Sequence, residues 1–187
     1  GVSKVPDFDA TLEFMGLVVP GMTRVGILYN TGDDSDTAFA DRLEAAVGNH
    51  GARLVRIGVE NANDIPQRVR SAQGRADLLF IPASSLLQPA SAAIASNANQ
   101  IGLPVFGSNT ATVDNHQMLA TLAVDFRQIG VKAGVLAARI LRGEDAEAIA
   151  VAIPTRSDHV MRISARRLAA LGLSLPKSLE NCGCVAQ

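Results

Sequence analysis

Short polar residues follow each of four apolar, strand-like runs in this sequence. The runs and the clusters that follow them are 25–30 with 31–36, 78–81 with 82–85, 104–106 with 107–110, and 119–124 with Asp125. In an open parallel sheet, ligands bind just beyond the carboxyl ends of the strands, where loops and helix N-termini supply hydrogen-bonding groups. The pattern therefore predicts a binding site for a small molecule, without catalytic machinery.

The first cluster, residues 30–36, combines amide, hydroxyl and carboxylate groups and includes Thr31. Gly32 lets the backbone turn tightly, and the helix expected next points free N–H groups at whatever lies in the loop. Three aspartates concentrate negative charge there, which argues against a phosphate and for a ligand with an ammonium group or several hydroxyls. The alternative is that Ser35 and Asp36 only cap the helix.

Asp125 is the strongest single candidate for a ligand-binding residue. A carboxylate at the end of an apolar strand is costly to desolvate unless it binds something. The alternative is that it caps the helix that begins near Arg127. Ser108 and Asn109 follow the strand at 104–106 and add neutral donors and acceptors. Groups of this kind orient a small polar ligand.

A catalytic nucleophile is the competing interpretation of Ser84 and Ser85, because hydrolases place a serine at a strand-to-helix turn. The sequence lacks the Gly-x-Ser-x-Gly elbow. His50, His116 and His159 fall in turns or at a strand start, where a histidine usually faces solvent, so no general base is evident. The phosphate-loop and dinucleotide motifs are also absent. We therefore expect a protein that is not an enzyme and needs no cofactor.

The composition favours one α/β body with a sizeable core. The 187 residues carry a net charge of -1, and 48% are hydrophobic against 19% charged. No apolar stretch reaches the roughly 18 to 20 residues that span a bilayer. Positive side chains are dispersed except at Arg162, Arg166 and Arg167, and aromatic residues make up 4% with no tryptophan. We therefore expect no nucleic-acid partner.

The two cysteines, Cys182 and Cys184, lie close to the end of the sequence. Structural zinc takes four ligands, and the nearest imidazole is His159, so we expect no metal site. Free thiols in a disordered tail and a disulfide in an oxidising compartment are the remaining interpretations.

Alternating strand and helix patterns predict a doubly wound parallel sheet over residues 20–120. Strands are expected at 24–30, 53–59, 78–81, 105–106 and 119–124, and later at 150–153 and 159–163. Helices are expected from a cap at Asp7 or Asp9 to Val18, from Asp36 to Val47, at 65–72, from a cap at Ser84 or Ser85 to Gln100, at 127–142, and from a cap at Ser164 to Leu171. The helix at 127–142 has only a narrow polar stripe, and a helix that apolar is usually buried on more than one side.

Six stretches occur in unbroken order: TRVGILYN at 23–30, IPAS at 81–84, LPVFGS at 103–108, LATLAVDF at 119–126, IG at 129–130 and AARILRGE at 137–144. Together they resemble the substrate-binding components of ABC importers with the type I periplasmic-binding fold, in the group that includes binders of tryptophan and other aromatic amino acids. The resemblance implies two α/β lobes that close on a ligand by hinge motion. It divides this chain into the second, ligand-binding lobe at 1–125, a helix at 126–150 that packs on a missing first lobe, returning strands and a short helix at 151–180, and a tail at 181–187.

The resemblance also implies a function. The protein would bind a small polar solute reversibly, an amino acid or related carboxylate being favoured, and deliver it to the permease subunits of an importer in the periplasm or another extracytoplasmic space, either free or anchored as a lipoprotein. The family's contacts fall on Asn30, Ser35, Asp36, Ser84, Ser85, Ser108 and Asp125 of this sequence. Asp125 would bind the ammonium group of the ligand, and the helix start at 35–37 would bind its carboxylate.

The sequence departs from the family at two places, which leaves the solute open. Thr31-Gly32-Asp33 replaces a proline-containing turn, and Ala83-Ser84-Ser85 replaces Thr-Asp-Asn. Without its first lobe, the helix at 127–142 would find a substitute partner, such as a second copy of the chain. The competing functions are the ligand-sensing core of a transcriptional regulator with the same fold and an enzyme of flavodoxin-like or hydrolase type.

Overall fold

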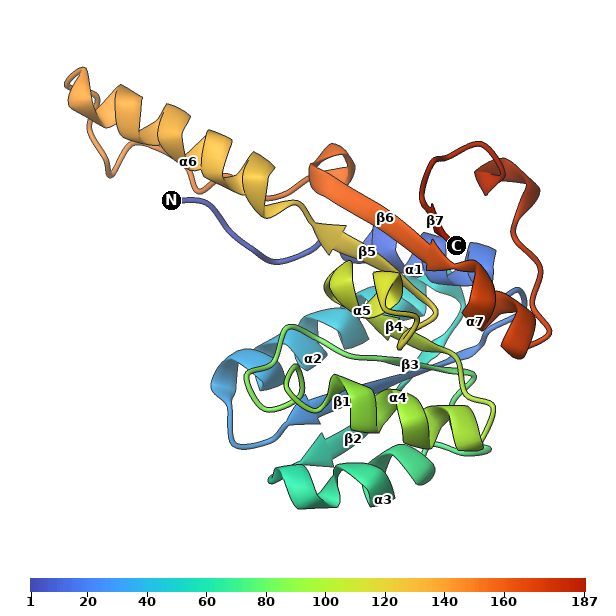
Figure 1. The fold of residues 1–187 in the computed structure, drawn as a ribbon. Coiled ribbons are helices and arrows are strands. Elements are labelled where there is room, and N and C mark those ends of the chain that lie inside the picture. The colour runs from blue at the N-terminus through green and yellow to red at the C-terminus, as the bar shows by residue number, and fades with distance from the viewer.

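The computed structural model describes residues 1–187 and has a seven-stranded sheet at its centre (Figure 1). The strands are β1 (Arg24–Asn30), β2 (Arg53–Val59), β3 (Leu78–Phe80), β4 (Val105–Gly107), β5 (Ala120–Val124), β6 (His159–Ser164) and β7 (Val185–Ala186). Their spatial order is β2-β1-β3-β4-β5-β6-β7. The first five are parallel, which confirms the predicted doubly wound sheet. β6 runs antiparallel to β5, and β7 runs parallel to β6.

Helices cover both faces of the sheet. They are α1 (Phe8–Val18), α2 (Asp34–Val47), α3 (Ile65–Arg70), α4 (Ser91–Gln100), α5 (Ala111–Asp114), α6 (Phe126–Leu141) and α7 (Ala165–Ala170), with short 3-10 turns η1 (Gly48–His50), η2 (Ala62–Asp64), η3 (Arg156–Asp158) and η4 (Lys177–Leu179). Successive strand residues point to opposite faces, so Ile27 belongs to the core beneath α1 and α2, whereas Leu28 belongs to the core beneath α3 and α4. Because β1 to β5 run parallel, their carboxyl ends lie together at one edge of the sheet.

The helix α2 begins earlier than the sequence pattern predicts. Its N-cap is Asp33, whose carboxylate accepts hydrogen bonds from the backbone N–H of Ser35 at 2.8 Å and of Asp36 at 3.2 Å. The expectation that Ser35 or Asp36 caps this helix is wrong, because the earlier aspartate already satisfies the free N–H groups of the first turn. The side chain of Asp36 is left available to the edge of the sheet.

The helix that ends at Gln100 begins at Ser91, so the cap predicted at Ser84 or Ser85 is wrong. Pro89 disfavours helical backbone at the residue before it, and residues 82–90 form a loop instead. That loop is closed by a hydrogen bond from the backbone N–H of Gln88 to the carbonyl of Ser84 at 3.0 Å.

The strand expected at 150–153 does not form. Ala152 makes a single parallel bridge with Val2, and the neighbouring Val151 and Ile153 are 59% and 66% exposed. Alternating apolar residues make a strand only where one face is covered, and no element of this chain covers these side chains.

The helix α6 extends away from the body of the molecule and has no buried residue (Figure 1). Its large exposed apolar side chains are Phe126, Val131, Val135, Ile140 and Leu141. The expectation that this helix is buried on more than one side is wrong for this chain, because nothing in the chain covers its apolar sides. Neither α6 nor any other helix is both long and apolar enough to cross a lipid bilayer.

Near the end of the chain, Cys182 and Cys184 form a disulfide, which decides between the two interpretations of these cysteines. Cys184 and Leu179 are buried in the core beneath α1 and α2. The short strand that follows pairs with β6, so the last residues form part of the sheet and are not a disordered tail.

Candidate ligand-binding site

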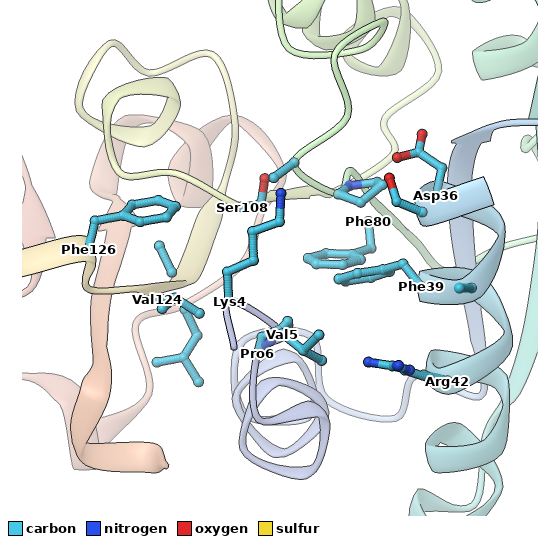
Figure 2. Close-up of a pocket in the computed structure, with 16 residues that line it drawn as sticks. Lys4, Val5, Pro6, Asp36, Phe39, Arg42, Phe80, Ser108, Val124 and Phe126 are labelled. Atoms are coloured by element: carbon cyan, nitrogen blue, oxygen red, sulfur yellow. The ribbon is translucent and has the colours of Figure 1, made fainter. Parts of the chain in front are cut away.

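A pocket of about 230 Å³ lies at the carboxyl ends of β3, β4 and β5, beside the start of α2 (Figure 2). Five parts of the chain line it: residues 4–6, the first turns of α2, the end of β3 with the residues after it, Ser108, and residues 122–124 with Phe126. This is the edge of the sheet at which ligands are expected in open parallel sheets.

Two stacked phenylalanines form one wall of the pocket (Figure 2). The rings of Phe39 in α2 and Phe80 in β3 have centroids 5.7 Å apart and an interplanar angle of 22°. Phe8 supports Phe39 from behind in an edge-on contact, with centroids 5.0 Å apart. Aromatic rings offer a large apolar surface against which another ring can stack or pack edge-on.

Asp36 is the acidic side chain of the pocket, and it is 4% exposed. Its Oδ2 accepts a hydrogen bond from the backbone N–H of Asn30 at 2.9 Å, which fixes the carboxylate against the end of β1. No lysine or arginine of the chain forms an ion pair with it. A buried carboxylate is costly without a cationic partner, and an ammonium group of a ligand would supply one.

Lys4 and Arg42 also line the pocket, and neither forms an ion pair within the chain. Figure 2 shows Lys4 extending through the pocket toward Ser108, and Arg42 beyond Phe39 on the side of α2. Their charges are therefore free to attract an anionic group such as a carboxylate. The pocket combines one carboxylate, two cations and a flat apolar wall.

Gln88 holds together the loops that follow β3 and β4. Its Nε2 donates to the carbonyl of Pro82 and to the hydroxyl of Ser108, both at 3.1 Å, and its Oε1 accepts a hydrogen bond from Asn109. The other amide atom of Asn109, Oδ1, accepts from the backbone N–H of Thr112 at 3.1 Å. Asn109 is thus committed to loop structure, while Ser108 faces the pocket.

Of the nine residues that the sequence nominates, the structure brings Ser35, Asp36 and Ser108 to the pocket. The others, which do not line it, are Asn30, Thr31, Ser84, Ser85, Asn109 and Asp125. The Oδ1 of Asn30 accepts from the N–H of Gly32 at 3.0 Å, and Ser84 is buried with no partner for its hydroxyl. A part for these six residues in binding stays a prediction.

Asp125 is the N-cap of α6, and its carboxylate accepts a hydrogen bond from the backbone N–H of Arg127 at 2.8 Å. This is the capping alternative that the sequence left open. The backbone N–H of Asp125 donates to the carbonyl of Asp158 at 2.7 Å. Asp125 therefore joins the ends of two segments beside the pocket without facing into it.

The carboxylate of Asp158 anchors α6 to the body. It accepts hydrogen bonds from Lys132 and from the backbone N–H and hydroxyl of Thr155 at 2.8 and 2.9 Å. These bonds, above all the one from Lys132, lower the pKa of Asp158 to about 2. At the start of α2, hydrogen bonds from Ser35 and from the helix N–H groups likewise lower the pKa of Asp33. Both carboxylates remain charged at neutral pH.

Sequence reasoning missed the aromatic wall and both cations. Phe39 follows Asp36 by three residues, a spacing that places the two on one face of a helix, so this pair could have been found. Phe80 is the last residue of its strand and looks like any core residue in the sequence. Lys4 reaches the pocket through long-range folding that no local pattern reveals.

The fold agrees with a comparison across known families. The family described as ABC transporter substrate binding protein matches residues 1–180, and the chain belongs to it. The family consists of substrate-binding proteins, which confirms the expectation of a binding protein and not an enzyme.

One relative is a tyrosine-binding protein of Clostridioides difficile (strain R20291), 26% identical over 187 residues, covering 97% of this chain and 54% of the relative. A conserved domain protein of Vibrio cholerae matches in structure with a TM-score of 0.81 at 22% identity, covering 99% of this chain and 61% of the other. An ABC domain from Streptococcus pneumonia, solved in complex with L-Trp, matches with a TM-score of 0.77 at 20% identity, covering 92% and 57%. The likeness confirms the fold class, and the chain spans between about half and three fifths of these proteins.

Proposed function

We propose that this chain forms one lobe of a substrate-binding protein that holds an amino acid with an aromatic side chain and releases it unchanged to an importer. The observation that carries the proposal is the placement of Asp36 and the stacked Phe39 and Phe80 in one pocket. The ammonium group of the ligand pairs with Asp36, and its ring packs on the two phenylalanines.

The carboxylate of the ligand is assigned to the cations. Lys4 and Arg42 approach the pocket from the N-terminal segment and from α2, and neither forms an ion pair within the chain. This arrangement differs from the one proposed from the sequence, in which Asp125 binds the ammonium group of the ligand. Asp36 is more deeply buried and lines the pocket, whereas the Asp125 carboxylate caps α6.

Two features of the relatives support an aromatic ligand. One relative is named a tyrosine-binding protein, and a structure of the same fold was solved with L-Trp. The pocket volume of about 230 Å³ is below the range of about 300 to 1,000 Å³ typical of complete ligand sites. A pocket of that size fits a site for which this chain supplies one side.

This chain covers only 54% to 61% of the length of the relatives described above. We therefore assign the second side of the site to a region that corresponds to the rest of those relatives. We place that part against the exposed apolar residues of α6. This location for the other lobe follows the division at residue 126 that the resemblance implies. Permease subunits and an extracytoplasmic location belong to the same proposal, and the Cys182–Cys184 disulfide suits an oxidising compartment.

Calorimetric titration of the full-length protein tests the proposal. L-Tyrosine, L-tryptophan and L-phenylalanine are titrated beside L-leucine, L-glutamate and two analogues of tyrosine, one without the carboxylate (tyramine) and one without the amino group. We expect binding of at least one aromatic amino acid and a loss of at least about tenfold for either analogue, because each leaves a charged group of the pocket unpaired.

Three results would contradict this proposal or a part of it. Equal affinity for L-leucine and the aromatic amino acids would remove the role of the phenylalanine wall. Binding of the analogue without an amino group at full affinity would remove Asp36. Chemical conversion of any ligand would contradict a binding protein altogether.

A further inference from the structure

We propose that Gln88 is a positioning residue that fixes the hydroxyl of Ser108 as a hydrogen-bond donor to the carboxylate of the ligand. Lys4 supplies the positive charge for the same carboxylate. The inference rests on the proposed function, because it concerns how the same pocket recognises its amino acid.

The amide of Gln88 lies between the loops that follow β3 and β4. It contacts Pro82 in the first loop and both Ser108 and Asn109 in the second. Gln88 does not line the pocket, whereas Pro82 and Ser108 do. Gln88 can therefore affect a ligand only through residues that it contacts, and Ser108 is the one among them that offers the pocket a polar side chain.

The hydrogen bonds around Gln88 have only one possible direction. The backbone N–H of Thr112 can only donate, so the atom of Asn109 that lies 3.1 Å from it is the oxygen Oδ1. The amide nitrogen of Asn109 is then the atom that donates to Oε1 of Gln88. On the other side, the carbonyl oxygen of Pro82 can only accept, so the atom 3.1 Å from it is Nε2 of Gln88. Both neighbours give the same orientation of the Gln88 amide.

This orientation decides the role of the Ser108 hydroxyl. Nε2 of Gln88 donates to Oγ of Ser108 at 3.1 Å, and this is the one hydrogen bond that the hydroxyl makes within the chain. A serine hydroxyl has one proton and two lone pairs, and an amide nitrogen cannot accept. Gln88 therefore occupies a lone pair of Ser108, and the proton of Ser108 is left for an acceptor in the pocket.

The position of Lys4 indicates which acceptor this is. An ammonium group also only donates, and Figure 2 shows Lys4 extending through the pocket toward Ser108. Two donors, one of them positively charged, suit a carboxylate, which has two accepting oxygens. Asp36 and Arg42 belong to α2, a different wall of the pocket. The amino acid is thus held by its carboxylate at Lys4 and Ser108 and by its ammonium group at Asp36.

The test is calorimetry on the full-length protein with a matched pair of ligands. L-Tyrosine or L-tryptophan, whichever binds more tightly, is titrated beside its analogue without the carboxylate, tyramine or tryptamine. The variants are Ser108→Ala, Gln88→Met and the two combined, with Lys4→Met and Arg42→Met made separately. Ser96→Ala is the control, because Ser96 is an exposed serine of α4 outside the pocket.

We expect Ser108→Ala to weaken binding of the amino acid about 10-fold or more, the size of a lost hydrogen bond to a charged group, and to change binding of the analogue less than about 2-fold. Gln88→Met should weaken binding of the amino acid about 3- to 10-fold alone and less than about 2-fold in the Ser108→Ala background. Lys4→Met should weaken it more than Arg42→Met does. Ser96→Ala should leave the affinity for both ligands unchanged.

Neutron diffraction from ligand-free crystals shows the direction of the hydrogen bonds without a variant or a ligand. We expect deuterium atoms on Nε2 of Gln88 that point toward Pro82 and Ser108, and a Ser108 deuterium that points away from Gln88. A Ser108 deuterium directed at Gln88 overturns the inference.

The affinities can overturn it as well. Equal losses for the amino acid and its analogue in Ser108→Ala would show that the hydroxyl does not contact the carboxylate. An effect of Gln88→Met that persists in the Ser108→Ala background would leave Gln88 a structural role only. A larger loss from Arg42→Met than from Lys4→Met would place the carboxylate at α2.

The comparison of Gln88→Met with and without Ser108→Ala uses the amino acid alone, so it decides the matter even where the analogue binds too weakly to measure. If no aromatic amino acid binds the wild type, the proposed function fails and the carboxylate contact fails with it. The neutron data then still decide whether Gln88 holds Ser108 as a donor.

Discussion

The two sides of the pocket differ in how firmly the chain holds them. On the α2 side, Asp36 and Phe80 are each 4% exposed, and Phe39 is packed between Phe80 and Phe8. On the opposite side, residues 4–6 lie outside any helix or strand, and Phe126 at the start of α6 is 66% exposed. The first side is built into the core, so it is preformed. The second is open, and under the proposed function it is completed by a ligand or by another part of the protein.

The largest effect that separates the two sides is on folding. Phe80→Ala removes a buried ring from the core beneath α2 and should lower the free energy of unfolding by about 3 to 5 kcal/mol. Phe126→Ala, the matched control on the other side, should change it by less than about 0.5 kcal/mol in residues 1–187, because its ring is already in water. Urea denaturation measures both. Equal losses would show that the two sides are held alike.

Ligand affinity gives the next contrast. Asp36→Asn keeps the shape of the side chain but removes its charge, and it should weaken binding of an aromatic amino acid to the full-length protein by about 2 to 5 kcal/mol. Asp34→Asn, in the same turn but exposed and outside the pocket, is the control and should leave affinity unchanged. The same calorimetry on Asp125→Asn decides between the two assignments of the ammonium group, since a large loss there would favour Asp125.

The open side should become firm when the rest of the protein is present. In the full-length protein, Phe126→Ala should cost about 1.5 to 3 kcal/mol, the value for burying a ring of this size, although it costs almost nothing in residues 1–187. Denaturation of both lengths, with and without the substitution, gives the comparison. A negligible cost in both would mean that α6 is not covered there.

The smallest effect concerns the base of α6. The pKa of Asp158 is lowered to about 2, mainly by Lys132, so the contribution of this carboxylate to stability is present above about pH 4 and is lost as the pH falls toward about 2. Lys132→Met removes the main cause and should raise the titration midpoint of Asp158 toward its ordinary value. Carbon-13 NMR of the carboxyl group measures it, and an unmoved midpoint would assign the shift to Thr155 instead.

The sequence predicts the core-built elements of the fold better than the open side of the pocket. The sheet and most helices follow from local patterns. The apolar run at 24–30 is a strand buried on both faces, and Leu43 and Val47 have the spacing of one buried helix face. Two failures are local, and hydrophobic periodicity detects neither: Asp33 caps α2 ahead of Asp36, and Pro89 disfavours a start of α4 before Ser91. The strand expected at 150–153 and the burial expected for α6 fail because no other element covers those apolar side chains.

The site was less predictable than the fold. The polar clusters indicate the correct edge of the sheet, and Ser35, Asp36 and Ser108 do reach the pocket. The side chains that give the pocket its chemistry come from far apart in the chain, with Lys4 and Phe80 brought together only by the finished fold. A carboxylate at a strand end can also serve as a cap, as Asp125 does for α6, so its part in binding stays a prediction.

A crystal structure of the full-length protein with L-tyrosine or L-tryptophan tests the central claim most directly. We predict the ligand ring against Phe39 and Phe80, with its ammonium group within hydrogen-bonding distance of Asp36. A ligand whose ammonium group lies on Asp125, or whose ring lies away from the two phenylalanines, would contradict the account.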